Sequence, residues 1–250
     1  MDWPPNERDD YDYGAVNFVS NVFYYDALNN LEQLLPGNGY ESMAKQVRQK
    51  MLALFKRADG GLVDNANSDH MALHTAVMAL AFDLAEENSR KYLADFVAGK
   101  GMKCSVYMAQ FLLDACFKAN KAQHAIELMR SDKERSWLNM MAQGSTISME
   151  AWSNELKPNQ DWNHAWGAAP ANIIPRRLAG IRPLEYGFKK FIIDPQAGDV
   201  KEFVMRHPTP KGEITLEYSS GNMQFTVPTG TTAVVKNKEY AAGKHTVKLD

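Results

Sequence analysis

Four of the five tryptophans lie between residues 137 and 166, in a segment that also holds carboxylates and a histidine. A tryptophan ring is a flat apolar plate with one N–H donor, and a sugar presents an apolar C–H face edged by hydroxyls. Rings, acids and an imidazole at close spacing therefore point to a carbohydrate site. Residues 2–12 form a second acid-rich segment, with five carboxylates around two prolines. Two carboxylates from separate parts of a chain are what acid–base hydrolysis of a glycosidic bond requires.

The segment 2–12 is predicted to be an extended rigid loop, because Pro4 and Pro5 keep it out of a helix. Such a loop can present proton donors and groups that bind hydroxyls. The alternative interpretation is a solvated acidic terminus whose aspartates cap the first helix.

The segment 144–152 places Glu150 two residues before Trp152. An aromatic environment disfavours the ionised form of a glutamate and raises its pKa, whereas a neighbouring donor can hold it ionised as a base. The alternative is a glutamate in the first turn of a helix.

The segment 161–167 alternates polar and aromatic residues, and His164 can donate to a sugar hydroxyl or to a carboxylate. The alternative is a capping motif with Asp161 or Asn163 at a helix start. His70 and His74 are four residues apart but lack the glutamate of the metalloprotease pattern, so we interpret them as a polar lining of the helical part. We expect no metal and no cofactor.

Two kinds of periodicity divide the chain near residue 186. Before it, apolar residues recur at helical spacing, which predicts seven or eight helices in paired antiparallel order, as in an α/α toroid. After it, short β-branched and aromatic runs predict about six strands in an antiparallel β-sandwich. The expected domains are 1–186 and 187–250. The helical candidates are 13–35, 40–58, 70–84, 89–98, 103–119, 121–130, 134–142 and 163–178. The stripe expected on the first helix is Val16, Val19, Phe23, Ala27, Leu28, Leu31 and Leu35.

Composition excludes several function classes. The chain has 250 residues, a formal net charge of −2 and 45% hydrophobic residues, so neither disorder nor attraction to nucleic acid or to an anionic membrane is indicated. No apolar run approaches the length of a membrane span, and the first residues lack the pattern of a signal peptide. Cys104 and Cys116 are expected on one helix, too far apart to bridge. The sequence leaves the oligomeric state and the location open. One expectation is that the chain is part of a longer enzyme that is periplasmic or secreted.

Three motifs in order resemble the α-L-rhamnosidases of glycoside hydrolase family 78. They are the acidic loop Asp2–Arg8, the segment Gly144–Trp152 and the run Asn163–Gly167, and Pro183–Phe191 is similar to the family's passage into its C-terminal β domain. The resemblance covers essentially the whole chain. It implies a six-hairpin toroid followed by a β-sandwich, and a substrate that carries a terminal α-L-rhamnose.

The resemblance also implies roles for individual residues. Glu7 is expected to be the general acid and Glu150 the general base of an inverting hydrolysis. The expected substrate-binding residues are Asp2, Arg8, Tyr11, Trp152, Trp162, His164 and Trp166.

The chain departs from the family pattern in two ways. The family's loop continues to a further aspartate, and the matching position in this chain is Gly14. The loop starts at residue 2, and a full toroid has about twelve helices, so we expect an incomplete toroid from a longer enzyme. Two alternatives stay open: another α/α-toroid glycosidase or a lyase acting on rhamnose-rich polysaccharide, and a carbohydrate-binding remnant without turnover.

Overall fold

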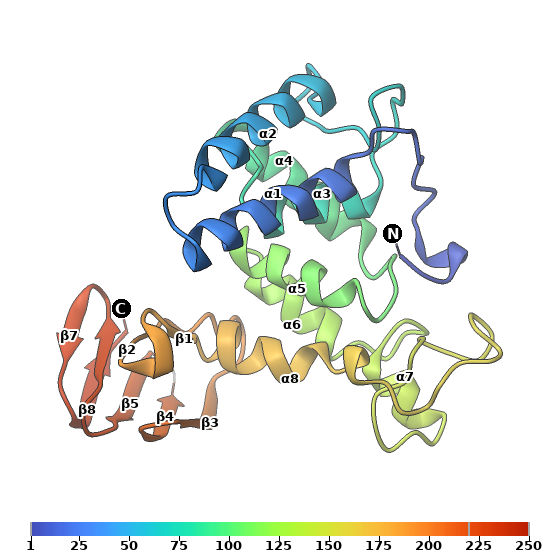
Figure 1. Ribbon diagram of the computed structural model, residues 1–250. Coiled ribbons are helices and arrows are strands. Elements are labelled where there is room, and N and C mark those ends of the chain that lie inside the picture. The colour runs from blue at the N-terminus through green and yellow to red at the C-terminus, as the bar shows by residue number, and fades with distance from the viewer. Residues whose placement is uncertain (1, 220, 250) are drawn as a thin grey trace. The chain divides into compact units, whose positions relative to one another are not determined.

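The protein is described by a computed structural model that covers residues 2–219 and 221–249 and separates into two compact units (Figure 1). The first unit comprises Met1–Ala169 and is helical. The second comprises Pro170–Asp250 and is built mainly of strands. The helical part followed by a β part confirms the predicted fold class.

The first unit consists of helices that pair in sequence order. Helix α1 packs on α2, α3 on α4, and α5 on α6, as expected for successive helical hairpins. The α-helices are α1 (Phe18–Leu34), α2 (Tyr40–Phe55), α3 (Leu73–Ala81), α4 (Glu87–Lys100), α5 (Ala109–Lys118), α6 (Ala122–Met129) and α7 (Trp137–Ala142). The 3₁₀ turns η1 (Pro5–Glu7) and η2 (Ala165–Gly167) flank them.

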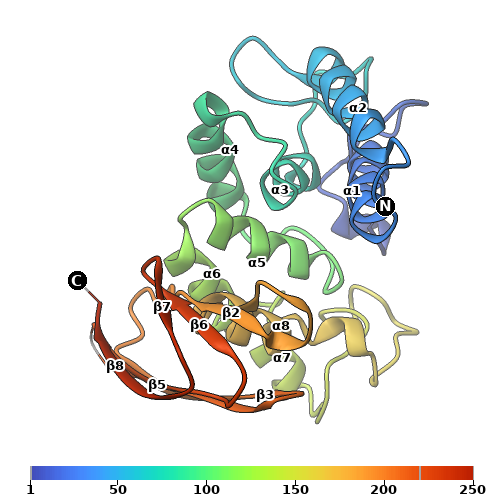
Figure 2. The ribbon, with the colours of Figure 1, turned by 60° about the vertical axis from the view of Figure 1, so that its left-hand side comes forward.

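Helix α3 is the centre of this unit. All nine of its residues are buried, and it contacts α1, α4 and α5 (Figure 2). Its residues are mainly apolar, and its polar His74 and Thr75 are paired with the buried Asp2 and Asp64, so the helix can lie inside the core. Neither α3 nor any other helix within the described residues is long and apolar enough to cross a membrane.

The first helix starts later than its apolar pattern predicted. The side chain of Asn17 accepts a hydrogen bond from the Ser20 N–H at 3.0 Å, so this residue is the N-cap. The buried residues of α1 are Phe18, Val19, Val22 and Leu28. The predicted stripe was therefore wrong for four exposed residues: Val16 and Leu35 lie outside α1, and the face of α1 that is turned to the core does not include Phe23 and Ala27.

Cys104 lies ahead of α5 rather than on the helix with Cys116, which corrects the predicted span 103–119. Both thiols are buried and neither is bridged. Burial raises the pKa of Cys116 to about 12 and raises that of Cys104 as well. Both side chains are therefore inert core thiols.

The chain passes from the first unit to the second within helix α8 (Ala169–Ile173), and the second unit continues with a π-helical turn (Ile174–Leu178) and a β-sandwich. The strands are β1 (Ile181–Pro183), β2 (Lys190–Ile193), β3 (Glu202–Thr209), β4 (Gly212–Ser219), β5 (Asn222–Val227), β6 (Thr232–Val235), β7 (Lys238–Tyr240) and β8 (Gly243–Lys248). They form two sheets in the orders β1-β2-β6-β7 and β3-β4-β5-β8. The pairing is antiparallel except between β2 and β6, which run parallel.

The sandwich core is formed by the alternate residues of each strand that face inward. Phe191 and Ile193 from one sheet pack with Leu216 and Phe225 from the other. Strand β1 precedes the predicted boundary at residue 186, and β1 with β7 brings the described strands above the six expected. Both additional strands have only three residues, too few to show an alternating pattern.

Candidate active site

The acidic loop 2–12 is anchored to the core of the first unit by its own carboxylates. Asp2 is only 6% exposed; its Oδ2 lies 2.8 Å from Nε2 of His74 and accepts a hydrogen bond from the Ser105 N–H at 2.8 Å. The Ser105 hydroxyl donates to the other carboxylate oxygen. Both oxygens of Asp2 are thus occupied by protein, so its part in rhamnose binding stays a prediction.

Asp9 is the second anchor. Its Oδ2 accepts from the N–H of Leu73, the first residue of α3, at 2.8 Å and lies 2.9 Å from the Lys100 ammonium. Asp9 therefore caps α3 rather than the first helix, and its negative charge interacts favourably with the positive end of the α3 dipole. The interpretation of the loop as a solvated terminus was wrong for Asp2 and Asp9, whereas Asp10 and Asp12 are exposed.

Glu7 is enclosed at the end of η1 and is 1% exposed. Arg135 forms a bidentate ion pair with Glu7: its Nε donates to Oε2 at 2.8 Å, and its Nη2 donates to Oε1 at 3.1 Å. Burial raises the pKa of Glu7, and the guanidinium opposes that rise without cancelling it. A raised pKa suits a proton donor, while the two-pronged contact leaves no oxygen free.

Tyr11 and Arg8 serve the loop in different ways. The Tyr11 hydroxyl lies 3.0 Å from the carbonyl oxygen of Asp64 and accepts from the Val19 N–H at 3.3 Å, and the side chain is 5% exposed. Burial raises its pKa. The Arg8 guanidinium lies 5.7 Å from the ring centroid of Trp3 and 5.3 Å from that of Tyr13. Arg8 is only partly buried, so it remains accessible, whereas Tyr11 is a core residue.

Glu150 is positioned by a short pairing between two chain segments. Its N–H donates to the Asp161 carbonyl at 2.9 Å, and the Asp161 N–H donates to Oε2 of Glu150 at 3.0 Å. The Lys157 ammonium lies 2.8 Å from the same Oε2. The hydrogen bond from Lys157 is the largest cause that lowers the pKa of Glu150. Within the described residues no donor contacts Oε1, so the carboxylate is ionised with one oxygen open.

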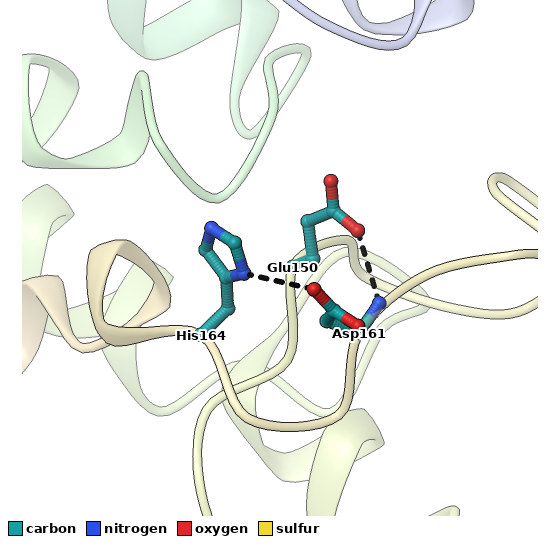
Figure 3. Close-up of side chains that lie close together, drawn as sticks. All are labelled: Glu150, Asp161 and His164. Atoms are coloured by element: carbon teal, nitrogen blue, oxygen red, sulfur yellow. Dashed lines mark hydrogen bonds and ion pairs between the residues drawn. The ribbon is translucent and has the colours of Figure 1, made fainter.

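His164 lies in the same pairing, opposite Ser148. The His164 N–H donates to the Ser148 carbonyl at 2.9 Å, and the Ser148 hydroxyl donates to the His164 carbonyl at 2.7 Å. Figure 3 shows the imidazole, Glu150 and Asp161 turned toward one another, with Nδ1 of His164 3.8 Å from Asp161 Oδ2. A side chain at Gly167 would bring its Cβ to 2.5 Å from the Met149 carbonyl oxygen, so this close approach requires glycine.

The tryptophans of the segment 137–166 divide into core and surface. Trp152 is fully buried; its Nε1–H donates to the Cys104 carbonyl at 2.7 Å, and its ring meets Trp137 at a centroid distance of 5.0 Å. Trp152 therefore has no exposed ring face to offer a sugar, in contrast to its expected role as a substrate-binding residue. Trp162 and Trp166 are 41% and 42% exposed and offer such faces.

Glu150, Asp161 and His164 bring potential ligand atoms to within 4.8 Å of one another, the kind of group that can hold a metal ion. The Lys157 ammonium on Glu150 opposes a cation there. His70 and His74 do not share a site either: His70 lies before α3 and contacts Asp64, while His74 contacts Asp2.

Three further residues shape the site and carry no signal in the sequence. Arg135 and Lys157 are cations placed on the two catalytic candidates by tertiary contacts. Asp64 is fully buried, and its Oδ1 accepts from the Ala72 N–H at 2.8 Å. Through its carbonyl oxygen it also holds Tyr11. These three residues could be identified only from the fold. Arg135 is 128 residues from Glu7 in the sequence, and Lys157 and Asp64 lie in irregular loops.

The structure brings the predicted residues together in two groups. One group is the loop with Asp2, Glu7 and Arg8, and the other is Glu150 with His164 and the surface tryptophans. A hydrogen bond from the Asn6 side chain to the Leu156 carbonyl at 3.5 Å connects the loop to the segment that follows Glu150.

Two family models account for nearly all of the sequence. The model of the bacterial alpha-L-rhamnosidase 6 hairpin glycosidase domain matches residues 1–178. The chain belongs to this family. The model of the bacterial alpha-L-rhamnosidase C-terminal domain matches residues 180–248, so the family's domain change falls next to β1.

Individual relatives of this chain are much longer. An α-L-rhamnosidase of Alteromonas sp. (strain LOR) is 25% identical over 245 residues, which is 90% of this chain and 26% of the relative. The native α-L-rhamnosidase of Aspergillus terreus superposes with a TM-score of 0.77 at 16% identity, covering 91% of this chain and 29% of that one. The α-L-rhamnosidase of Streptomyces avermitilis, solved in complex with L-rhamnose, gives 0.77 at 18% identity over 98% of this chain and 29% of its own. The chain therefore spans between a quarter and a third of these relatives.

The departure at Gly14 has a steric counterpart in this member of the family. A Cβ at residue 14 would lie 2.5 Å from the side chain of Asn65. Asn65 is buried and donates to the Asp12 carbonyl at 3.0 Å. The space that an aspartate would need is thus filled by a residue that fixes the loop.

Proposed function

We propose that this chain forms part of an inverting α-L-rhamnosidase in which Glu150 is the general base and Glu7 the general acid. The observation that carries the proposal is the asymmetric environment of Glu150, in a chain of the rhamnosidase six-hairpin family. One oxygen is tied to Lys157 and the Asp161 N–H, and the other is open to a water molecule. An ionised carboxylate with one free oxygen is suited to accept a proton from water.

The proposed reaction uses two proton transfers. Glu7 gives its proton to the glycosidic oxygen as the bond from this oxygen to the anomeric carbon breaks. A water molecule attacks that carbon from the opposite face and loses a proton to Glu150, so the product has the inverted configuration. Delivery of the proton from Glu7 requires its contact with Arg135 to open, because the guanidinium occupies both oxygens.

The sugar is held by groups around these carboxylates. His164 faces Glu150 and supplies ring nitrogens to hydroxyls, and Trp162 and Trp166 supply exposed ring faces. Arg8 is the accessible cation of the loop. The solved relative from Streptomyces avermitilis binds L-rhamnose, which supports rhamnose as the terminal sugar.

We further propose that turnover belongs to an assembly larger than these 250 residues. The relatives are three to four times as long as the part that matches, since the chain covers 26% to 29% of them. The successive helix pairs of the first unit are fewer than the six hairpins named in the family description.

The test uses para-nitrophenyl α-L-rhamnoside with a protein that includes the remaining hairpins. Glu150→Gln and Glu7→Gln should each reduce turnover by several orders of magnitude, while Glu155→Gln, an exposed neighbour, should not. Proton NMR of the first-formed sugar should show the β anomer. Early appearance of the α anomer would assign Glu150 as a nucleophile, and near-normal turnover of either variant would remove that residue from the mechanism.

A second candidate function is rhamnose binding without hydrolysis. The observation that favours it is the enclosure of Glu7, which is 1% exposed and fully engaged by Arg135. NMR titration of the chain with L-rhamnose, beside the hydrolysis assay, distinguishes the two. Saturable binding that requires His164, together with no turnover in the larger protein, would support the binding function.

A further inference from the structure

Five aromatic rings form one continuous set of contacts on the first unit, which we call the aromatic strip. Trp166 contacts Tyr107, Tyr107 contacts Phe111, and Phe111, Phe82 and Phe23 contact one another at the far end of the strip. Neighbouring ring centroids along the strip are 5.4 to 6.0 Å apart. The rings come from η2, the loop before α5, α5 itself, the end of α3 and α1, so the fold assembles the strip from distant parts of the sequence.

The strip lies at the surface and is not a core cluster. Tyr107 is 46% exposed and Phe23 is 42% exposed, and Phe82 and Phe111 between them are partly exposed. Contiguous exposed apolar surface of this kind marks a binding site more often than a chance arrangement.

The strip begins beside the candidate site. The ring of Trp166 lies 4.1 Å from the imidazole of His164, and His164 is grouped with Glu150 and Asp161. A substrate whose terminal sugar is held at His164 and Glu150 can therefore continue directly onto Trp166 and Tyr107.

The ring orientations select the shape of the occupant. The ring planes that meet along the strip cross at 56° to 80°, except those of Phe82 and Phe111, which are tilted by 31°. A rigid flat polycycle needs faces that are nearly coplanar, whereas a chain of pyranose rings can turn at each linkage and place a C–H face on each facet. The geometry therefore favours an oligosaccharide.

Polar edges on the strip favour the same occupant. The Tyr107 hydroxyl and the Trp166 Nε1–H have no hydrogen-bond partner among the described residues, although both belong to aromatic contacts. By contrast, Trp137 and Trp152 donate their Nε1–H groups to carbonyl oxygens at 2.6 and 2.7 Å. Rings with free donors at their edges match sugar faces with hydroxyls at theirs.

We propose that the aromatic strip binds the oligosaccharide that carries the terminal rhamnose, one sugar ring after another away from Glu150. The proposal rests on the proposed function for the position of the first sugar, and it assigns the direction and the chemical class of the rest of the substrate.

The test compares two probes on the chain itself. L-Rhamnose reports on the His164 site, and a linear α-linked rhamnose tetrasaccharide reports on the site and the strip together. Tyr107→Ala and Phe23→Ala remove exposed rings and should each weaken tetrasaccharide binding roughly three- to tenfold, with rhamnose binding unchanged. Tyr24→Ala is the matched control, because Tyr24 lies next to Phe23 on α1, is 47% exposed and has no ring contact among the described residues.

The outcomes separate this proposal from the proposed function. If the wild-type chain did not bind L-rhamnose, or if His164→Ala left rhamnose binding unchanged, while strip-dependent tetrasaccharide binding was retained, the rhamnose site alone would be contradicted. Equal affinity for the two probes, absence of tetrasaccharide binding, or equal effects of Phe23→Ala and Tyr24→Ala would overturn the strip proposal. So would a wild-type dimer in solution that becomes monomeric in Phe23→Ala, since that result would assign the strip to a second copy of the chain.

Discussion

The Lys157 ammonium lies 2.8 Å from Oε2 of Glu150, and both side chains are largely buried, at 13% and 15% exposure. This ion pair has two effects on Glu150. It lowers the pKa of Glu150, and it leaves Oε1 as the oxygen that can receive a proton.

Replacing Lys157 by methionine should raise the pKa of Glu150. In the wild-type chain the pKa of Glu150 is lowered by folding. The ionised Glu150 therefore contributes to stability above the ordinary pKa of glutamate, and this contribution is lost as the pH falls through the pKa of the folded state. Lys157→Met should therefore reduce stability at neutral pH, and the difference from wild type should disappear in acid. Carbon-13 NMR titration of the Glu150 carboxyl measures the shift directly.

Two control variants accompany that titration. Lys157→Arg should keep the low midpoint, because it keeps the cation. Lys45→Met removes an exposed lysine that pairs with Glu41 and should leave Glu150 unchanged. An unchanged midpoint in Lys157→Met would mean that the Asp161 N–H alone controls Glu150.

Arg135→Gln should destabilise the first unit by about 3 kcal/mol at neutral pH, because it leaves Glu7 buried and charged. The pKa of Glu7 is already raised by burial, and loss of the guanidinium should raise it further. A raised acid pKa favours folding at low pH and loses that benefit as the pH rises through the folded value, so the deficit should shrink in acid. Thermal unfolding at about pH 7 and about pH 4.5 measures the change.

The double variant Glu7→Gln, Arg135→Gln serves as the reference for that pair. It has no carboxylate at this position, so its stability relative to wild type should depend less on pH than that of Arg135→Gln. A deficit of Arg135→Gln that grows in acid would show that Glu7 is not the group responsible.

The sequence predicts the elements better than the contacts between them. Strong apolar periodicity placed α2, α3 and the change from helix to strand, because the burial of a face imposes that period on many residues at once. The start of α1 was misplaced, because the cap at Asn17 is one side-chain hydrogen bond that an apolar stripe does not reveal. The short strands β1 and β7 were missed for a similar reason.

The candidate site shows the same division. Glu150 and His164 stand close together in sequence, and local pairing of residues 148–150 with 161–164 explains why they meet. Arg135 reaches Glu7 across 128 residues, and no local pattern encodes that contact. Composition also could not separate Trp152 in the core from Trp166 at the surface, since a tryptophan serves equally well in both settings.

Trp152→Ala should reduce stability, whereas Trp162→Ala should reduce sugar binding. Trp152 is fully buried against Trp137 and donates to the Cys104 carbonyl, so its truncation should cost about 3–5 kcal/mol of unfolding free energy. Trp162 is 41% exposed, so its truncation should change stability by less than about 0.5 kcal/mol and act on sugar binding instead. Chemical denaturation of both variants checks the assignment, and similar losses would refute it.

Gly167→Ala should disturb His164 without touching it. The new Cβ would meet the Met149 carbonyl at 2.5 Å, and a backbone oxygen inside a paired segment cannot move aside freely. The strain should cost on the order of 1–3 kcal/mol and displace the segment 164–167 from its partner 148–150. Gly99→Ala is the matched control, because a Cβ on this α4 residue meets nothing within 4 Å and should be neutral or stabilising by up to about 1 kcal/mol. Thermal unfolding gives the stability of each variant, and the His164 ring signals in nitrogen-15 NMR report its position. If Gly167→Ala kept both its melting temperature and its His164 signals, the close packing of these two segments would not be what holds His164 beside Glu150.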